Sequence, residues 1–398
     1  MWDRIAVWNW HEKNPTDVGV FRSYGLWALV RYFLYLGTAG FGGPVALVEY
    51  MHRDLVERRG WISEDEYREG LALANLSPGP LAAQLAIYLG FVHHSFLGAT
   101  LVGLAFVLPS FLMVVAIGWA YLEFGGLSWM QAVFYGVGAA IIGIIAWSAY
   151  RLTRKTIAAD PLLWVIFLVM AAVTAITERE QLILFPLAGL VVWLARNPSF
   201  GRRSGTAAGF LLVPITFQTA AAMPSLSEIF WFFFAAGAFV FGSGLAIVPF
   251  LYGGAVVDYG WLTSEQFLDA VAVAMITPGP VVITTAFIGY LVAGLPGAIF
   301  AAVATFLPAY LLTVFPAPYF RKYGSRPTLA AIVDGVTAAA IGAIAGAVIV
   351  LGRRAIIDLT TGLLALAALL ILWKSPRRIP EPLIVAAAAF FGLVLYPG

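Results

Sequence analysis

The chain has no cysteine and few charged residues, and each shortage excludes a class of protein. Without cysteine there is no disulfide framework, no thiolate metal site and no cysteine nucleophile. Only 11% of the 398 residues are charged, against roughly 25% in soluble domains, and 61% are hydrophobic. A soluble globular protein is excluded on these grounds, and so is a disordered chain, which needs low hydrophobicity and high charge. The net charge of +2 leaves no basic surface for nucleic acid.

What the chain has instead is a series of long apolar runs, such as 162–177 and 362–373. A transmembrane β-barrel would need segments of ~10 residues that alternate apolar and polar positions. The unbroken runs therefore predict helices in a lipid bilayer. The first 24 residues carry tryptophans and acidic residues but no apolar core. We interpret them as an interfacial segment, not as a cleavable signal peptide.

The sequence repeats itself at an offset of 200 residues. Four motifs of the first half fall on related motifs of the second half: Phe41-Gly42-Gly43 on Phe241-Gly242-Ser243, Gly60-Trp61-Ile62-Ser63 on Gly260-Trp261-Leu262-Thr263, Ser77-Pro78-Gly79-Pro80 on Thr277-Pro278-Gly279-Pro280 and, after one deletion, Leu108-Pro109-Ser110-Phe111 on Leu307-Pro308-Ala309-Tyr310. A single offset that holds across separate motifs indicates a duplicated architecture.

The repeat predicts how the chain is organised. We expect an N-terminal interfacial segment (1–24), a first repeat (25–195), a linker (196–227) and a second repeat (228–398). The linker contains an apolar stretch, 206–223, of about 18 residues, which is enough for one crossing. One extra crossing between two equal halves inverts the second half, as in inverted-repeat transporters. The expected fold is an all-α integral membrane protein with two inverted repeats of broken or re-entrant helices, joined by one extra transmembrane helix.

Loop charge supports the inversion. Loop 51–70 carries four arginines, whereas the corresponding loop 251–270 carries neither lysine nor arginine. Because cytoplasmic loops are enriched in Lys and Arg, the two loops should face opposite sides of the membrane. The same rule places the N-terminus in the cytoplasm and the C-terminus on the opposite side. The charge distribution also favours re-entrant hairpins or deeply broken helices, over full crossings, for segments 25–50 and 65–92.

Proline and glycine break the apolar segments at the same place in both halves. A buried helix break in a membrane is tolerated where protein or water lines it. A helix that starts after Pro80 or Pro280 points free N–H groups and the positive end of its dipole at the break. Inverted halves would bring two such starts together near the midplane, which suits an oxyanion. The alternative is that each Pro-Gly-Pro only shapes a hairpin tip for packing.

The candidate binding residues are those of the breaks and their neighbours: Gly42, Gly43, Pro44, Ser77, Pro78, Gly79, Pro80, Gln84, Gly242, Ser243, Gly244, Thr277, Pro278, Gly279, Pro280 and Arg31. The glycine pairs form either a second backbone cradle or a close packing surface between helices. Arg31 either neutralises an anion or extends to the membrane surface. Glu49 is a candidate proton-coupling group, with a solvated hairpin end as its alternative reading.

Signatures of enzymes are absent from the sequence. There is no Walker A pattern, no HExxH and no paired Asp-rich motif. We therefore expect no catalytic residues, no cofactor and no metal site. The adjacent His93 and His94 lie at a predicted helix boundary and are interpreted as an interfacial pair.

Taken together, the FGGP, GWI and SPGP motifs of the first half and their second copies resemble the chromate ion transporter family in its two-domain form. The resemblance covers nearly the whole chain, from about 25 to 396. It implies a bacterial or archaeal inner-membrane (plasma membrane) protein that exports chromate, with sulfate as the physiological look-alike. The expected partners are chromate or sulfate and the lipid bilayer, and a homodimer is compatible with the sequence. Gly244 stands where the first copy has Pro44, a variation that second halves of the family tolerate.

Two other functions stay open at this point. One is uptake of sulfate or a related oxyanion by proton symport, for which flux would depend on Glu49. The other is a non-transporting membrane scaffold, in which the breaks would serve packing alone.

Overall fold

The computed structural model describes residues 24–41, 43–124, 128–178, 181, 183–196, 224–238, 240, 244–323, 327–374, 379 and 381–396. These residues form helices and the loops that join them, and contain no strand. The first half contains α1 (Leu26–Ala39), α2 (Gly43–Met51), η2 (His52–Arg58), α3 (Glu64–Leu76), α4 (Leu81–Phe124), α5 (Ser128–Thr156), α6 (Pro161–Thr177) and α7 (Leu184–Arg196). The second half contains α9 (Leu226–Ala238), η3 (Gly244–Ile247), α10 (Val248–Tyr252), η4 (Gly253–Asp258), α11 (Ser264–Ile276), η5 (Val281–Ile283), α12 (Thr284–Val314), α13 (Ala317–Tyr323), α14 (Pro327–Ala355), α15 (Leu359–Lys374) and α16 (Glu381–Leu395).

These elements confirm the all-α fold with two related halves. The apolar stretch 206–223, which was expected to form the extra crossing, and the interfacial segment up to residue 23 lie outside the described residues. Within the described part, four helical stretches are long and apolar enough to cross a membrane: Leu81–Phe124, Ser128–Thr156, Val281–Val314 and Ala330–Ala355.

Segments 25–50 and 65–92 each form a helical hairpin. The hydroxyl of Tyr32 on α1 donates to the carbonyl of Tyr50 on α2 at 3.3 Å, so α2 returns along α1. At the open ends of the two hairpins, Tyr24 stacks on Trp61 with ring centroids 4.8 Å apart and lies 5.5 Å from the His93 ring. Both hairpins therefore open toward the same face of the molecule, and their tips lie inside it.

A sharp turn divides α4, and another divides α12, into two arms. The backbone dihedral angles are non-helical at residues 94–95 in α4 and at residues 293–294 in α12. At the first turn, a Cβ on Gly98 would lie 2.1 Å from the Gly90 carbonyl oxygen, and the same contact recurs between Gly297 and Gly289. Glycine thus allows the backbones of the two arms, before and after each turn, to be in direct contact.

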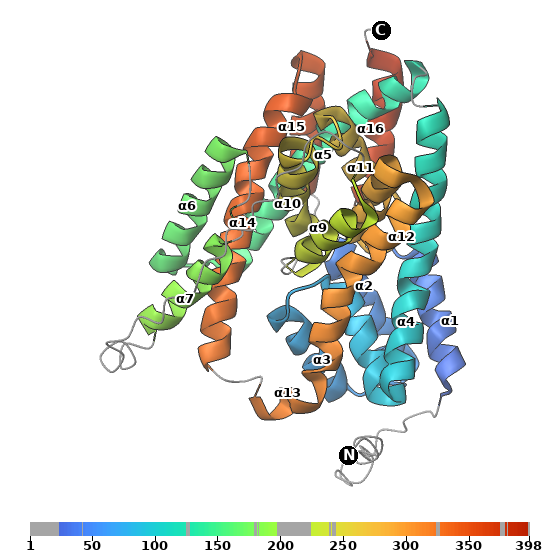
Figure 1. Ribbon diagram of the computed structural model, residues 1–398, viewed down its shortest axis with the longest axis vertical. Coiled ribbons are helices and arrows are strands. Elements are labelled where there is room, and N and C mark those ends of the chain that lie inside the picture. The colour runs from blue at the N-terminus through green and yellow to red at the C-terminus, as the bar shows by residue number, and fades with distance from the viewer. Residues whose placement is uncertain are drawn as a thin grey trace.

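The two halves are intertwined. Helices α6 and α7 of the first half pack on α14 of the second, whereas α15 and α16 of the second half pack on α5 of the first (Figure 1). The contacts are close: a Cβ on Gly143 of α5 would lie 2.4 Å from the carbonyl oxygen of Ala365 on α15. Each half therefore completes its packing on a helix of the other.

Two clusters of side-chain hydrogen bonds, one at the start of α14 and one at the start of α5, show that the halves are inverted. Near the start of α14, Arg196 donates to Asp334 at 2.6 Å and to Asp160, the N-cap of α6, at 2.9 Å. Near the start of α5, Tyr135 donates to Asp358, which precedes α15. The start of each long helix thus lies beside the end of the other, so α5 and α14, which correspond in the repeat, run antiparallel.

Hydrogen bonds in these two clusters also stabilise the charged forms of Asp160 and Asp358. The Arg196 guanidinium is the main cause that keeps the pKa of Asp160 below its ordinary value. For Asp358, the main cause is the backbone N–H of Thr361, which donates at 2.7 Å and lowers the pKa. Both carboxylates are therefore charged at physiological pH, where they cap the first turns of α6 and α15.

The intertwined packing predicts a stability difference within α5. A Cβ on Gly136 would lie 2.0 Å from the Ala388 carbonyl oxygen, whereas nothing lies within 4 Å of a Cβ on Gly138. We expect Gly136→Ala to destabilise the protein by about 1–3 kcal/mol, because α16 must move away. Gly138→Ala, the matched control, should be neutral or stabilising by about 0.4–1 kcal/mol. Thermal unfolding of both variants in detergent measures the difference, and equal midpoints would contradict the packing argument.

Candidate functional site

The tips of the hairpins meet in the centre of the molecule and are tied crosswise between the halves. The N–H of Gly79 donates to the carbonyl of Val240 at 2.5 Å, and the N–H of Gly279 donates to the carbonyl of Gly40 at 2.8 Å. Each Pro-Gly-Pro tip is therefore bonded to the chain just before the glycine break of the opposite half. Buried backbone groups need such partners, so these bonds fix the tips relative to each other.

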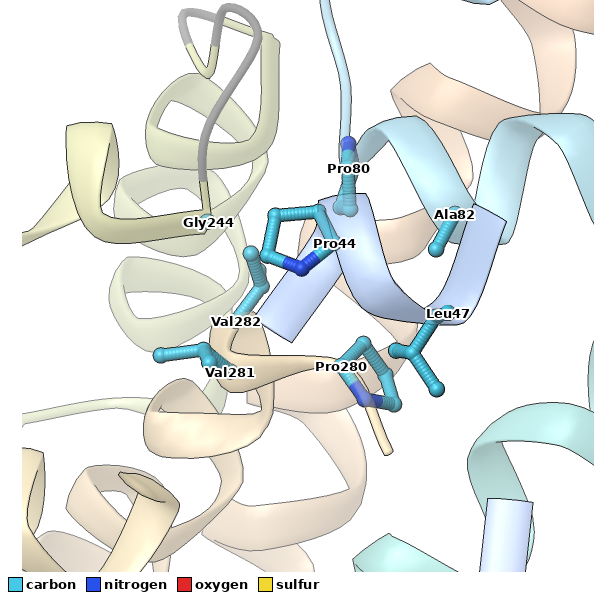
Figure 2. Close-up of a pocket in the computed structure, with 8 residues that line it drawn as sticks. All are labelled: Pro44, Leu47, Pro80, Ala82, Gly244, Pro280, Val281 and Val282. Carbon is cyan, nitrogen blue, oxygen red and sulfur yellow. The ribbon is translucent and has the colours of Figure 1, made fainter. Parts of the chain in front are cut away.

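A small pocket lies between the tips. Figure 2 shows its lining converging from both halves: Pro44, Leu47, Pro80, Ala82, Gly244, Pro280, Val281 and Val282. The lining side chains are apolar and none is charged. Selection of a polar ligand at this place must therefore come from backbone groups.

Four helical segments start at this pocket. These are α2 at Gly43, α4 at Leu81, η3 at Gly244 and η5 at Val281, of which η3 leads into α10 and η5 into α12. The first N–H groups of a helix have no acceptor within it. Each α-helix start carries roughly half a positive charge, so the starts of α2 and α4 together offer about +1, and the short 3-10 segments η3 and η5 add free N–H groups. The arrangement therefore presents backbone N–H groups to the pocket and no basic side chain.

Side chains just outside the pocket brace the tips. Gln84, fully buried, donates from Nε2 to the carbonyl of Pro78 at 2.9 Å, while its Oε1 is buried without a partner in the described structure. Ser110, also fully buried, donates to the carbonyl of Pro278 at 2.7 Å. Since Ser110 lies on α4 and Pro278 in the second half, this bond is a further tie between the halves.

Glycine is required at the two Pro-Gly-Pro tips. Gly79 has φ +142° and Gly279 has φ +98°, a region that other residues rarely adopt. A Cβ would also collide with neighbours, at 2.7 Å from Gln84 on Gly79 and at 1.9 Å from the Ser110 hydroxyl on Gly279. Conformation and space therefore exclude side chains at the same two positions.

The structure brings together many of the residues that the sequence singled out, in different roles. Of these candidates, Pro44, Pro80, Gly244 and Pro280 line the pocket, with Gly43 beside it at the start of α2. Pro78, Gly79, Gln84, Pro278 and Gly279 form or brace the tips. Ser77 and Thr277 cap the helices that lead to the tips, and Gly42, Gly242 and Ser243 lie outside the described residues.

The two charged candidates lie away from the pocket. Arg31 is exposed on α1, on the same face as the exposed Trp27 and Tyr35, and it does not line the pocket. This position fits an arginine that extends along an apolar surface to the membrane boundary. Glu49 is exposed on α2 and likewise does not line the pocket.

Sequence reasoning missed several participants. The lining residues Leu47, Ala82, Val281 and Val282 carry no chemical signal, because they are ordinary apolar residues next to the breaks. Ser110 belonged to a repeated motif but had no assigned role, and that repetition was the available signal. Within the described ranges, no group of three or more His, Asp or Glu residues could hold a metal ion.

Comparison with known proteins adds the identity of relatives. A family described as Chromate transporter matches residues 27–194 and 227–393. A chromate transport protein of Cupriavidus metallidurans is 64% identical over 94% of both chains. A probable chromate transport protein of Synechococcus elongatus is 61% identical over 94% of this chain and 96% of its own, and a chromate transport protein of Pseudomonas aeruginosa is 32% identical over 93% and 92%. No solved structure matches the chain.

Proposed function

The chain belongs to the chromate transporter family, and from this premise we propose that it exports the oxyanion chromate, with sulfate as a look-alike substrate. The anion binds in the central pocket at the helix starts, near the midplane of the membrane. Chromate and sulfate are both tetrahedral dianions, so a site built from backbone N–H groups accepts either one. The residues that we assign to this site are the pocket lining and the two Pro-Gly-Pro tips.

The observation that carries the proposal is the crossed pair of hydrogen bonds, Gly79 to Val240 and Gly279 to Gly40. These bonds hold four helical starts around one pocket, and such starts are ready sites for anions. A packing role alone would not require the same arrangement in both halves. The apolar lining favours transport and not permanent binding. An anion held only by backbone dipoles, with no basic side chain, can be released again.

Membrane potential supplies a driving force for export. A dianion that moves outward across an inside-negative membrane gains about 4.6 kcal/mol per 100 mV. At about 1.4 kcal/mol per decade, this sustains a gradient of roughly 10³. Export can therefore proceed by the potential alone or by exchange for another ion, whereas uptake would need co-transported cations.

The proposal includes a location and an orientation. We place the protein in the inner (plasma) membrane as a multi-pass protein, with the N-terminus in the cytoplasm and the C-terminus on the opposite side. The four arginines of loop 51–70, against none in loop 251–270, support this orientation. The many exposed apolar side chains of α4, α6, α15 and α16 support a lipid environment. A homodimer would leave the central pocket within each protomer.

Flux measurements in proteoliposomes test the function. Under an imposed membrane potential, the purified protein should move chromate, and sulfate should compete. Liposomes with an irrelevant membrane protein are the control. Flux that requires a proton gradient even when a potential is present would favour proton-coupled uptake instead. The absence of any chromate or sulfate flux would overturn the proposal and favour a scaffold.

A further inference from the structure

A half-buried carboxylate, Asp269, lies on α11 in contact with the other half of the molecule. Its Oδ2 accepts a hydrogen bond of 2.7 Å from the hydroxyl of Tyr121 on α4. The Tyr121 ring is itself held by Phe134 of α5 and Phe287 of α12, with centroids 5.6 and 5.7 Å away. Asp269 therefore sits where the second-half hairpin meets helices of both halves.

The charges around Asp269 leave it without a cation. In the described part of the chain, Asp269 forms no ion pair, and the titratable groups that face it are Tyr121 and Glu265. Glu265 lies one turn earlier on the same helix and is exposed. A carboxylate that is partly removed from water and lacks a cation is less stable in its charged form, and it can become neutral by taking a proton. The site can thus bind and release a proton.

The position of Asp269 links it to the central pocket. Asp269 lies eight residues before Thr277, which is at the tip of the same hairpin. A proton on Asp269 is therefore about 12 Å, measured along the axis of α11, from the Pro-Gly-Pro break. The corresponding residue of the first half, at the offset of 200, is Glu69 on α3. Each hairpin thus carries a carboxylate at the same depth, and inversion places the two on opposite sides of the pocket.

We propose that Asp269 is a proton-binding site that couples proton movement to anion movement through the pocket. The inference rests on the proposed function. A charged Asp269 accepts a strong hydrogen bond from Tyr121 and holds α11 against α4. Protonation on the carboxylate weakens that bond, which frees the hairpin and its tip to shift. The proton binds from the side to which the anion is released, and it leaves on the side from which the next anion binds, so one anion is exchanged for one proton.

A steady-state gradient measures the coupling directly. In proteoliposomes with the potential clamped at zero, one proton exchanged per anion changes the chromate gradient about tenfold per unit of pH gradient, because each pH unit is a tenfold ratio of proton activity. We expect this response in the wild type and none in Asp269→Asn. Glu265→Gln, the matched control on the same helix, should respond as the wild type does, and so should Glu49→Gln.

Several outcomes separate the inference from the function on which it rests. A wild type that carries chromate under a potential but ignores the pH gradient overturns the inference alone. A full response in Asp269→Asn, or its loss in Glu49→Gln instead, does the same. A wild type that carries no chromate under any condition overturns the proposed function.

A second variant covers the case in which Asp269→Asn does not fold. Tyr121→Phe keeps the carboxylate but removes the donor that stabilises its charged form. We expect it to retain the pH-driven gradient and to shift the pH of half-maximal flux upward. An unchanged pH profile in Tyr121→Phe would overturn the inference, because a merely structural contact leaves the profile in place.

Discussion

Replacement of Gly279 or Gly79 with alanine is expected to lower chromate flux by about 100-fold or more. Both glycines have positive φ, which costs a non-glycine residue about 1–3 kcal/mol. The added Cβ also overlaps Ser110 or Gln84, and overpacking adds about 1–3 kcal/mol. The tip must move to relieve both, and the crossed hydrogen bonds to Gly40 or Val240 are then lost. At 1.36 kcal/mol per decade, a combined cost of ~3 kcal/mol corresponds to a factor of about 100.

A matched control distinguishes the effect of a glycine's place at the pocket from the effect of its positive φ. Gly260 also has positive φ, at +60°, but nothing lies within 4 Å of a Cβ there and it does not line the pocket. Gly260→Ala should therefore cost some stability and leave flux close to that of the wild type. If the two tip variants also kept wild-type flux, measured per folded protein, the central position of the tips would be irrelevant to transport.

A negative charge placed in the pocket is expected to have the other large effect. Val282 is 1% exposed and its side chain lines the pocket beside Pro44 (Figure 2). A carboxylate there would lie within ~5 Å of a bound anion, which costs about 3 kcal/mol per unit of anion charge at an effective dielectric constant of about 20. Val282→Asp should therefore lose chromate binding by more than 100-fold, and flux with it.

The comparison with Val282→Asn isolates the charge. Asparagine has the size and polarity of aspartic acid without the negative charge, so any packing or desolvation defect is shared by both variants. Binding of chromate at pH 8, measured by calorimetry in detergent, should be much weaker in Val282→Asp than in Val282→Asn. Equal binding in the two variants would mean that the anion does not occupy this pocket.

The positions of the breaks could be predicted from the sequence, because they are local features. Proline and glycine interrupt an apolar segment whatever the rest of the chain does, so 40–44 and 77–80 were visible as breaks, and so were their second copies. Loop charge, which distinguishes the two sides of a membrane, also favoured hairpins or deeply broken helices for these segments, and the structure shows hairpins. The partners of the breaks could not be predicted. Nothing in the sequence near Gly79 indicates that its N–H meets the carbonyl of Val240.

The candidate site shows the same division. Pro44, Pro80, Gly244 and Pro280 line the pocket as expected from their motifs, but Arg31, a lone charge in an apolar segment, is exposed on α1. An intramembrane charge signals function only if its helix turns it inward, and the sequence of a single helix does not fix that rotation. The Asp269–Tyr121 contact was invisible for a related reason, because it joins residues of different halves.

By itself, the sequence determined the membrane environment, the all-α class, the duplicated halves and their inversion, and the family. The family follows from the resemblance of the repeated motifs to a known one. The other properties follow from composition, local motifs and loop charge, and none of them requires knowledge of a long-range contact. The tertiary structure alone decided that α6 and α7 pack on α14 while α15 and α16 pack on α5, and that the tips are bonded crosswise. Such pairings depend on which apolar faces fit together across hundreds of residues. Apolar side chains packed in an apolar solvent leave no distinguishing pattern in the chain.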